Sequence, residues 1–266
     1  MELLFVNWNV DPEIFRIGPI AVRWYGLLFA AAFFSGYVIL QRIFKNEGLS
    51  QELLDKLTMY VFLGTVIGAR LGHCLFYEPA YYLSHPLEIL KIWQGGLASH
   101  GAAIAILIAL YLFSRKVKKS FLWTFDRVVI VAALGCAFIR VGNLMNSEIY
   151  GYVTDVKWGF VFIRDHQLVP RHPTQIYEAL SYLVVFLILF FSYWRIEKAK
   201  TEGFLSGVFM VLMFSARFMI EFLKEVQEDF ESSMVLNMGQ WLSLPFIIAG
   251  FAIIFYALRN KKPVVS

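Results

Sequence analysis

Residues 128–151 have the sequence VVIVAALGCAFIRVGNLMNSEIYG, a long apolar run that ends in a cluster of polar side chains. An apolar run of this kind can cross a membrane as a helix, because about 20 apolar residues span a hydrocarbon core of about 30 Å. Arg140 lies inside the run, and Asn143, Asn146 and Glu148 follow it. A charged residue at that depth is costly and indicates a functional position. The stretch therefore predicts a transmembrane helix with a binding or reactive end.

The composition of the whole chain is also typical of a membrane protein. Of its 266 residues, 59% are apolar and 17% are charged, whereas a soluble domain of this size exposes much more charged surface. Apolar blocks of roughly 18–22 residues recur along the chain, which suits spanning helices. We therefore expect one all-α integral membrane domain over residues 1–266, with seven helices near 19–41, 57–77, 96–113, 126–143, 173–192, 204–222 and 239–258.

The distribution of Lys and Arg predicts the orientation of these helices. Fourteen of the 24 basic residues lie in loops on one side of the expected helices, and seven lie on the other side. The richer side is cytoplasmic under the positive-inside rule, which places the amino terminus outside and the carboxy terminus inside. Residues 1–9 contain no basic residue and no small-residue cleavage site, so we expect no removable signal peptide.

The longest expected outer segment, about residues 144–171, predicts a small extracytoplasmic head. Within it, the apolar stretches 158–163 and 168–170 flank the turn-like sequence Arg164-Asp165-His166-Gln167. This pattern favours a short β-hairpin, and an irregular loop is the alternative. A second outer segment, the acidic stretch 225–231, is expected to be a solvated loop.

Three arginines, Arg70, Arg140 and Arg217, fall inside apolar blocks. Each lies 13 or 14 residues beyond a basic residue or glycine that marks the inner end of its helix. At a rise of about 1.5 Å per residue, each is roughly 20 Å from the cytoplasmic surface. Tyr25 and His100, near the outer ends of the first and third helices, reach the same depth. We therefore expect one polar layer in the outer third of the membrane.

The neighbours of two of these arginines indicate specific pairs. Arg140 and Asn143 are three residues apart, and Arg217 and Glu221 are four apart, so each pair can share a helix face. Gly151 would let the backbone approach a ligand closely. The alternatives are that the arginines extend toward the interface or form ion pairs between helices.

A layer of guanidinium groups suits the phosphate of a phospholipid headgroup, because Arg presents a planar donor fork that matches phosphate oxygens. The same groups can stabilise a phosphate that leaves in a reaction, and His100 can act as an acid/base group or an anion partner. No metal-ligand, nucleotide-binding or nucleophilic-serine motif occurs, so neither metal nor cofactor is expected. Cys74 and Cys136 are expected only to pack. From the residues alone, an outer-leaflet lipid enzyme, a lipid transporter and a lipid sensor all stay open.

Seven motifs occur in order between about residues 19 and 245. The most specific contains Arg140, Gly142, Asn143, Asn146, Glu148 and Gly151. The others are 23–27 (RWYGL), 68–73 with 76–77 (GARLGH and FY), 93–101 (WQGGLASHG), 172–178 (HPTQIYE), 217–222 (RFMIEF) and 239–243 (GQWLS). Together these motifs resemble those of the prolipoprotein diacylglyceryl transferase family.

The resemblance implies a seven-span bacterial inner-membrane enzyme with a cavity open sideways to lipid. It implies transfer of the sn-1,2-diacylglyceryl group from phosphatidylglycerol to the lipobox cysteine of prolipoproteins, with a thioether formed and glycerol phosphate released. The partners would be phosphatidylglycerol, prolipoprotein signal peptides and membrane lipid, with no cofactor and no nucleic acid. The rival functions are an outer-leaflet anionic-phospholipid transporter, which usually has an internal pseudo-repeat not found here, and a lipid-binding sensor.

By motif position, the resemblance implies that Arg140 binds lipid, that Arg217 is a second essential arginine and that His100 is the base. The further candidate substrate-binding residues are Tyr25, Arg70, Asn143, Asn146, Glu148, Gly151 and Glu221. The chain departs from the family pattern at two points. Met213 stands one turn before Arg217, where the family commonly has Tyr, and Ser99-His100-Gly101-Ala102 replaces the usual aromatic-His-Gly-Gly.

Overall fold

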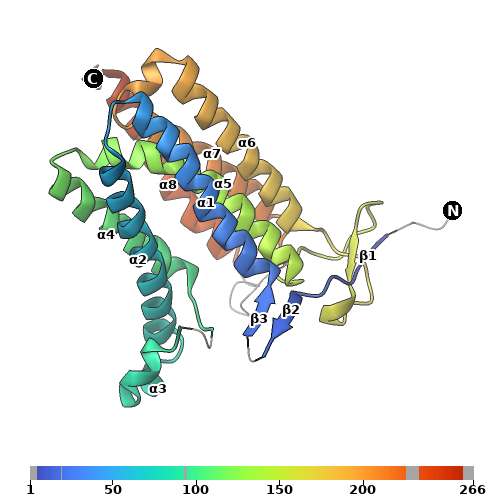
Figure 1. Cartoon of the computed structure of the whole chain (residues 1–266). Coiled ribbons are helices and arrows are strands. Elements are labelled where there is room, and N and C mark those ends of the chain that lie inside the picture. Colours follow the sequence, from blue (N-terminus) through green and yellow to red (C-terminus); the bar gives the residue numbers. More distant parts are fainter. Residues whose placement is uncertain (1–4, 19, 93–94, 226–233, 260–266) are drawn as a thin grey trace. The chain divides into compact units, whose positions relative to one another are not determined.

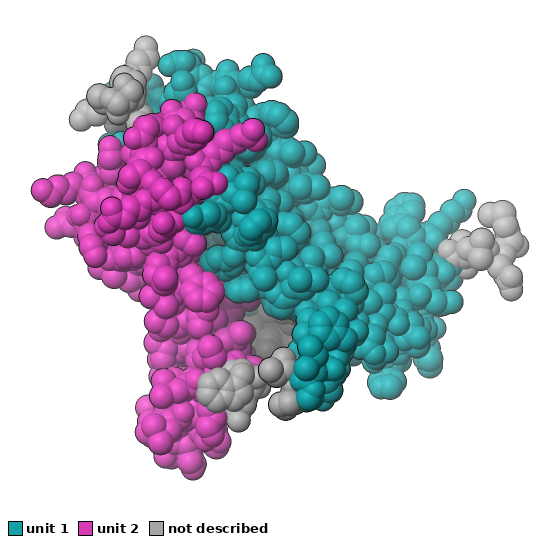
Figure 2. All heavy atoms as spheres, in the orientation of Figure 1, with its two compact units in different colours: residues 1–39, 126–265 teal, residues 40–125, 266 magenta. Residues whose placement is uncertain are grey.

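A computed structural model describes residues 5–18, 20–92, 95–225 and 234–259 of the chain. Contacts divide the chain into two compact units, coloured teal and magenta in Figure 2. Unit 1 comprises Met1–Ile39 and Asp126–Val265, and unit 2 comprises Leu40–Phe125 with Ser266. The expectation of a single domain stays a prediction. Parts of two expected features, Trp93-Gln94 of the third motif and residues 226–231 of the acidic loop, lie outside the described residues.

Seven helices among the described residues are long and apolar enough to cross a membrane (Figure 1). They are α1 (Trp24–Asn46), α2 (Gln51–Phe76), α4 (Ser99–Val117), α5 (Phe121–Met145), α6 (Thr174–Arg195), α7 (Phe204–Glu221) and α8 (Met238–Arg259). The prediction of seven spanning helices is confirmed. The largest differences in bounds are that α1 begins and ends later, and that α2 and α5 begin earlier, than the apolar blocks indicated.

Local sequence signals account for several helix ends. Ser50 caps α2, because its hydroxyl accepts a hydrogen bond from the Leu53 backbone N–H. Lys118 ends α4 in a left-handed conformation with a φ of 57°. Pro173 comes directly before α6. A backbone N–H at this position would have no partner within the helix, so proline, which has none, fits here without loss. Gly203 comes directly before α7 with a φ of 90°, which glycine adopts without steric cost.

A β-hairpin explains the late start of α1. Strands β2 (Glu13–Ile17) and β3 (Ile20–Arg23) pair antiparallel, and α1 begins directly after β3. The hairpin therefore occupies residues that hydropathy alone assigns to the outer end of the first helix.

The expected head at residues 144–171 differs from the predicted hairpin. Strand β4 (Phe160–Phe162) pairs in parallel with β1 (Val6–Trp8) from the amino-terminal segment. The chain that returns after β4 makes an isolated antiparallel bridge between Phe160 and Arg171, and the 3₁₀ helix η3 (Ile163–Asp165) lies in the predicted turn. The side chains of Leu144, Phe160 and Phe162 form a small core against Trp8, Tyr150 and Ile176. The head is thus built partly from residues about 150 positions away in the sequence, which local patterns do not reveal.

In unit 2, α2 and α4 approach each other closely through glycines. A Cβ atom at Gly68 would lie 2.6 Å from the Gly101 carbonyl oxygen, and a Cβ atom at Gly101 would lie 2.6 Å from Gly72 Cα. Small residues at such contacts are typical of helices that pack inside membranes. Two short helical segments, α3 (Pro79–Ser84) and η1 (Pro86–Leu90), follow α2 and are too short to show a helical period in the sequence.

Candidate active site

Arg140, on α5, forms an ion pair with a buried carboxylate on α6. Its Nε lies 3.1 Å from Glu178 Oε2, and the Glu178 side chain is 0% exposed. Glu178 Oε2 has no aligned hydrogen-bond donor among the described residues, so the contact is ionic. The Tyr182 hydroxyl donates a 3.1 Å hydrogen bond to Glu178 Oε1, and Arg140 Nη1 donates a 3.4 Å bond to Asn143 Oδ1. Glu178 therefore supplies the opposite charge that a buried guanidinium requires.

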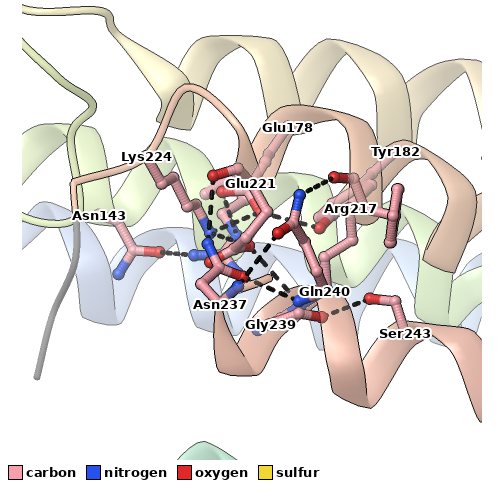
Figure 3. Close-up of polar contacts among 12 residues, drawn as sticks. Asn143, Glu178, Tyr182, Arg217, Glu221, Lys224, Asn237, Gly239, Gln240 and Ser243 are labelled. Carbon is pink, nitrogen blue, oxygen red and sulfur yellow. Dashed lines mark hydrogen bonds and ion pairs between the residues drawn. The ribbon is translucent and has the colours of Figure 1, made fainter. Parts of the chain in front are cut away.

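Glu178 also connects α6 to the end of α7. Lys224 Nζ lies 3.0 Å from Glu178 Oε1 and 3.4 Å from Glu221 Oε2. Arg217 Nε lies 4.0 Å from the same Glu221 oxygen. Alternating charges therefore form a continuous series of Arg140, Glu178, Lys224, Glu221 and Arg217, termed the charge series below. Figure 3 labels the last four of these residues. The structure thus links two of the three arginines that the sequence singled out, through two carboxylates and a lysine.

A second polar cluster closes the end of α5. The side-chain amides of Asn143 and Asn146 donate to Glu148 Oε1 at 2.7 Å and 3.2 Å, and Gln175 donates to the Glu148 carbonyl oxygen at 2.7 Å. Ser147, with a φ of 55°, turns the chain between these residues. Three predicted site residues therefore meet at one carboxylate, and Asn143 links this cluster to Arg140.

Tyr25 and Gly151 also belong to this region of unit 1. A Cβ atom at Gly142 would lie 2.7 Å from the Tyr25 ring, which shows that Tyr25 on α1 packs against α5 two residues beyond Arg140. A Cβ atom at Gly151 would lie 2.2 Å from the Leu223 carbonyl oxygen. Gly151 is therefore needed for a close backbone approach within the protein. Its contact with a ligand stays a prediction.

The start of α8 holds Glu221 in place. A Cβ atom at Gly239 would lie 2.5 Å from the Glu221 carboxyl carbon. The Asn237 side-chain amide donates to the Glu221 carbonyl oxygen at 3.3 Å, and Gln240 donates to the Phe218 carbonyl oxygen at 3.4 Å (Figure 3). The motif at residues 239–243 thus positions the carboxylate that accompanies Arg217.

In unit 2, the buried Arg70 is held by backbone carbonyl groups. Its guanidinium donates to the carbonyl oxygens of Glu88 at 2.6 Å, Ile89 at 2.9 Å and Gly95 at 2.7 Å. The sequence suggests a phosphate ligand for the layer of guanidinium groups that includes Arg70, but backbone carbonyl oxygens accept its hydrogen bonds in the structure. Arg70 therefore orders the segment between α3 and α4, and its role in lipid binding stays a prediction.

His100, also in unit 2, is the second residue of α4 and is exposed. Its ring centroid lies 5.3 Å from that of Phe76 and 5.8 Å from that of Tyr77, both at the end of α2. These rings hold the imidazole on one side and leave it accessible. Its membership of the polar layer with the unit 1 residues stays a prediction.

The two arginines of the charge series carry more N–H donors than their carboxylates use. Glu178 and Glu221 make their shortest contacts with Nε of Arg140 and Arg217, and Arg140 Nη1 donates to Asn143. The Arg140 side chain is 15% exposed and that of Arg217 is 35% exposed, so a ligand can reach both. Guanidinium groups bind phosphate oxygens well. No group of three or more potential metal ligands occurs within the part of the chain that the structure describes.

Comparison with known proteins shows the family of this chain. The family model of prolipoprotein diacylglyceryl transferase matches residues 12–256. The chain belongs to this family. It is 52% identical over 255 residues to the phosphatidylglycerol–prolipoprotein diacylglyceryl transferase of Tolumonas auensis. The aligned region covers 96% of this chain and 98% of that protein. The proteins of the same name from Chloroherpeton thalassium and Bacteroides fragilis are 46% and 44% identical, with at least 96% of each chain covered.

Membership of the prolipoprotein diacylglyceryl transferase family confirms the resemblance inferred from seven motifs. Two members of the charge series, Glu178 and Lys224, are absent from the set of site residues predicted from sequence. Glu178 lies in one of the motifs, and Lys224 is counted among the outer basic residues. The spacing of Lys224 from Glu221, three residues, could have indicated their pairing. The position of Glu178 between Arg140 and Lys224 depends on how α5, α6 and α7 pack, which no local signal shows.

Proposed function

We propose that this chain transfers the sn-1,2-diacylglyceryl group of phosphatidylglycerol to the lipobox cysteine of prolipoproteins. Family membership over nearly the whole chain makes the protein a multi-pass membrane transferase of lipoprotein biosynthesis. The observation that carries the proposed chemistry is the charge series from Arg140 to Arg217, in which Glu178 and Lys224 are buried and both arginines are partly exposed. Two guanidinium groups inside spanning helices are held by carboxylates at Nε, and their Nη donors suit a lipid phosphate.

The proposed reaction requires stabilisation of a leaving phosphate. The cysteine thiolate attacks the glyceryl carbon that is bonded to phosphate, and a sulfur–carbon bond forms as the carbon–oxygen bond breaks. The bonding electrons leave with glycerol phosphate, so negative charge increases on the phosphate in the transition state. Arg140 and Arg217 stabilise that charge, and fixed donors in a site of low dielectric constant do so more effectively than water. Glu178 and Glu221 keep the two guanidinium groups in place before the reaction.

The thiol must lose its proton before it attacks. A free cysteine thiol has a pKa near about 8.5, so it is mostly protonated at neutral pH. We assign the proton to His100, whose exposed ring packs against Phe76 and Tyr77. A neutral imidazole is well suited to this task, because its ordinary pKa lies near the operating pH.

The proposed orientation follows from the excess of Lys and Arg on one side of the helices. The amino terminus is outside the bacterial inner membrane and the carboxy terminus is cytoplasmic, so the polar layer faces the outer leaflet. A membrane-impermeant maleimide applied to intact cells should label an Asp11→Cys variant and spare an Arg259→Cys variant, both in a Cys74→Ala, Cys136→Ala background. Labelling of the Arg259→Cys variant without labelling of the Asp11→Cys variant would indicate the opposite orientation.

Mass spectrometry of a lipobox peptide tests the transfer itself. The purified protein is incubated with phosphatidylglycerol and the peptide, and a mass gain of one diacylglyceryl group on the cysteine is expected. The gain should be absent with a Cys→Ser peptide and with Arg140→Ala. It should persist with Arg164→Ala, a matched control at an exposed ion pair with Asp11. Lipid binding by the wild-type protein with no mass gain would favour a transporter or a sensor instead.

A further inference from the structure

A second buried carboxylate, that of Asp126 on α5, binds the start of α7. Asp126 lies in the second turn of α5 and is 3% exposed. Its Oδ2 accepts a 2.6 Å hydrogen bond from the Gly203 N–H. Its Oδ1 accepts from both the backbone N–H and the hydroxyl of Ser206, at 2.7 Å and 2.6 Å. All three donors belong to Gly203 and Ser206, so the carboxylate joins α5 to the first turn of α7.

The contact replaces a helix cap that α7 lacks. A helix leaves its first N–H groups without an intrahelical partner, and the side chain of its N-cap residue usually accepts from the third residue of the helix. Gly203 occupies the N-cap position and has no side chain, and Ser206 is the third residue of α7. Asp126 therefore supplies this acceptor from a neighbouring helix. Its negative charge also lies at the positive end of the α7 dipole.

This contact sets the height at which α7 begins along α5. Arg140 lies 14 residues beyond Asp126 on α5, and Arg217 lies 14 residues beyond Gly203 on α7. At about 1.5 Å per residue, each arginine is about 21 Å from the Asp126 contact. At the other end of the same helices, Glu178 pairs with both Arg140 and Lys224. The two ends together define the axial register of α7 against α5.

We propose that Asp126 is a positioning residue, which holds α7 in register with α5 and so keeps Arg217 level with Arg140 for one phosphate. The proposal rests on the proposed function, since it assumes that both arginines act on the same leaving group. Asp126 acts through α7 rather than by contact with the substrate. Misplacement of a catalytic group by about 1 Å can lower a rate about 100-fold, so a small axial slip of α7 is enough to affect turnover.

Thr124 provides a matched control on the same helix. It lies two residues before Asp126, is fully buried, and its hydroxyl shares a 2.7 Å hydrogen bond with Ser114 on α4. Thr124→Val therefore removes a buried polar contact from the same region of α5. It leaves the contact between Asp126 and α7 unchanged, so it separates loss of stability from loss of register.

The test compares Asp126→Ala, Asp126→Asn and Thr124→Val as full-length purified proteins with phosphatidylglycerol and a lipobox peptide. Asp126→Ala should lower kcat about 10- to 100-fold with little change in the KM of the peptide. Asp126→Asn keeps one acceptor oxygen and should fall between Asp126→Ala and wild type. Thr124→Val should lower Tm and leave kcat within about twofold of wild type. Because Glu178 ties α6 to Arg140 on α5, α6 serves as the reference for the position of α7. Nitroxide labels at the exposed positions Leu180 on α6 and Met219 on α7 should show a shifted or broader distance distribution in the Asp126 variants.

Three results would overturn the proposal. They are a wild-type kcat in Asp126→Ala, an equal loss of kcat in Thr124→Val at equal Tm, and a loss of kcat without any change in the distance distribution. Where Asp126→Ala does not accumulate in the membrane, Asp126→Asn is judged by the same criteria. Absence of peptide modification by the wild-type protein would instead overturn the proposed function, so the two failures are distinct.

Discussion

Replacement of Glu178 by Gln removes the negative charge between Arg140 and Lys224 with almost no change in shape. The carboxylate oxygens lie 3.1 Å from Arg140 Nε and 3.0 Å from Lys224 Nζ. At an effective dielectric constant of about 20, each contact contributes roughly 5 kcal/mol before desolvation is subtracted. Removal of one partner from a buried ion pair costs about 3–5 kcal/mol in measured cases, because the other charge stays buried. We adopt this lower range for the Glu178→Gln variant.

Thermal unfolding in detergent measures the effect. A chain of this size loses about 2–4 °C in Tm for each kcal/mol, so Glu178→Gln should lower Tm by roughly 6–20 °C. The double variant Glu178→Gln, Lys224→Met also removes one stranded cation and should regain part of the loss. A coupling of about 0.5–3 kcal/mol is expected between the two sites.

A matched control is Glu197→Gln, which breaks a 3.8 Å contact with Lys200 where the carboxylate is 92% exposed. Exposed pairs of this kind contribute little, so the Tm of this variant should stay near that of the wild type. If Glu178→Gln lowers Tm no more than this control, or if the double variant shows no coupling, the buried carboxylate of Glu178 does not stabilise the fold.

Further substitutions address single positions of the site and the head. Gly239→Ala would place a methyl group 2.5 Å from the Glu221 carboxyl carbon and should lower the rate of transfer about 10-fold. Its control is Gly135→Ala, where the nearest atom to the added methyl group is 3.9 Å away and the rate should not change. Equal activity of the two variants would contradict the role of Gly239. His100→Gln should lower kcat about 10²- to 10⁴-fold at neutral pH, and full turnover would exclude the imidazole as the base. Burial lowers the pKa of His172 below its ordinary value of 6.5, so the folded state favours the neutral ring and its stability should decline as pH falls below 6.5. His172→Gln should flatten this decline in Tm between about pH 7.5 and 5, and an unchanged slope would assign the effect to other groups.

The sequence predicts the membrane-spanning part of this fold well, because each span must be apolar along its whole length. Hydropathy therefore locates all seven helices, and the arginines stand out within them. Hydropathy does not predict strand β1, because nothing in the local sequence of Val6–Trp8 indicates that it pairs with Phe160–Phe162. Hydropathy does not predict the β-hairpin before α1 either, because an apolar strand and the end of an apolar helix have similar composition.

The candidate site shows a similar division. Spacing on one helix correctly indicates that Arg140 can reach Asn143 and that Arg217 can reach Glu221, although both contacts are long. The partner of Arg140 on α6, Glu178, requires knowledge of helix packing. Arg70 shows the opposite case, since its sequence context suggests an anion site and its guanidinium is satisfied by carbonyl oxygens. A buried charge can be located from sequence, but its partner depends on tertiary structure.

The most direct test of the proposed function is the ratio of the two products in one reaction. The purified protein is incubated with phosphatidylglycerol and a lipobox peptide, and both glycerol phosphate and modified peptide are measured over time. One glycerol phosphate should be released for each peptide modified, and both products should be lost together in Arg140→Ala and in Arg217→Ala. Release of glycerol phosphate without peptide modification, or bound lipid with neither product, would contradict transfer of the diacylglyceryl group at this site.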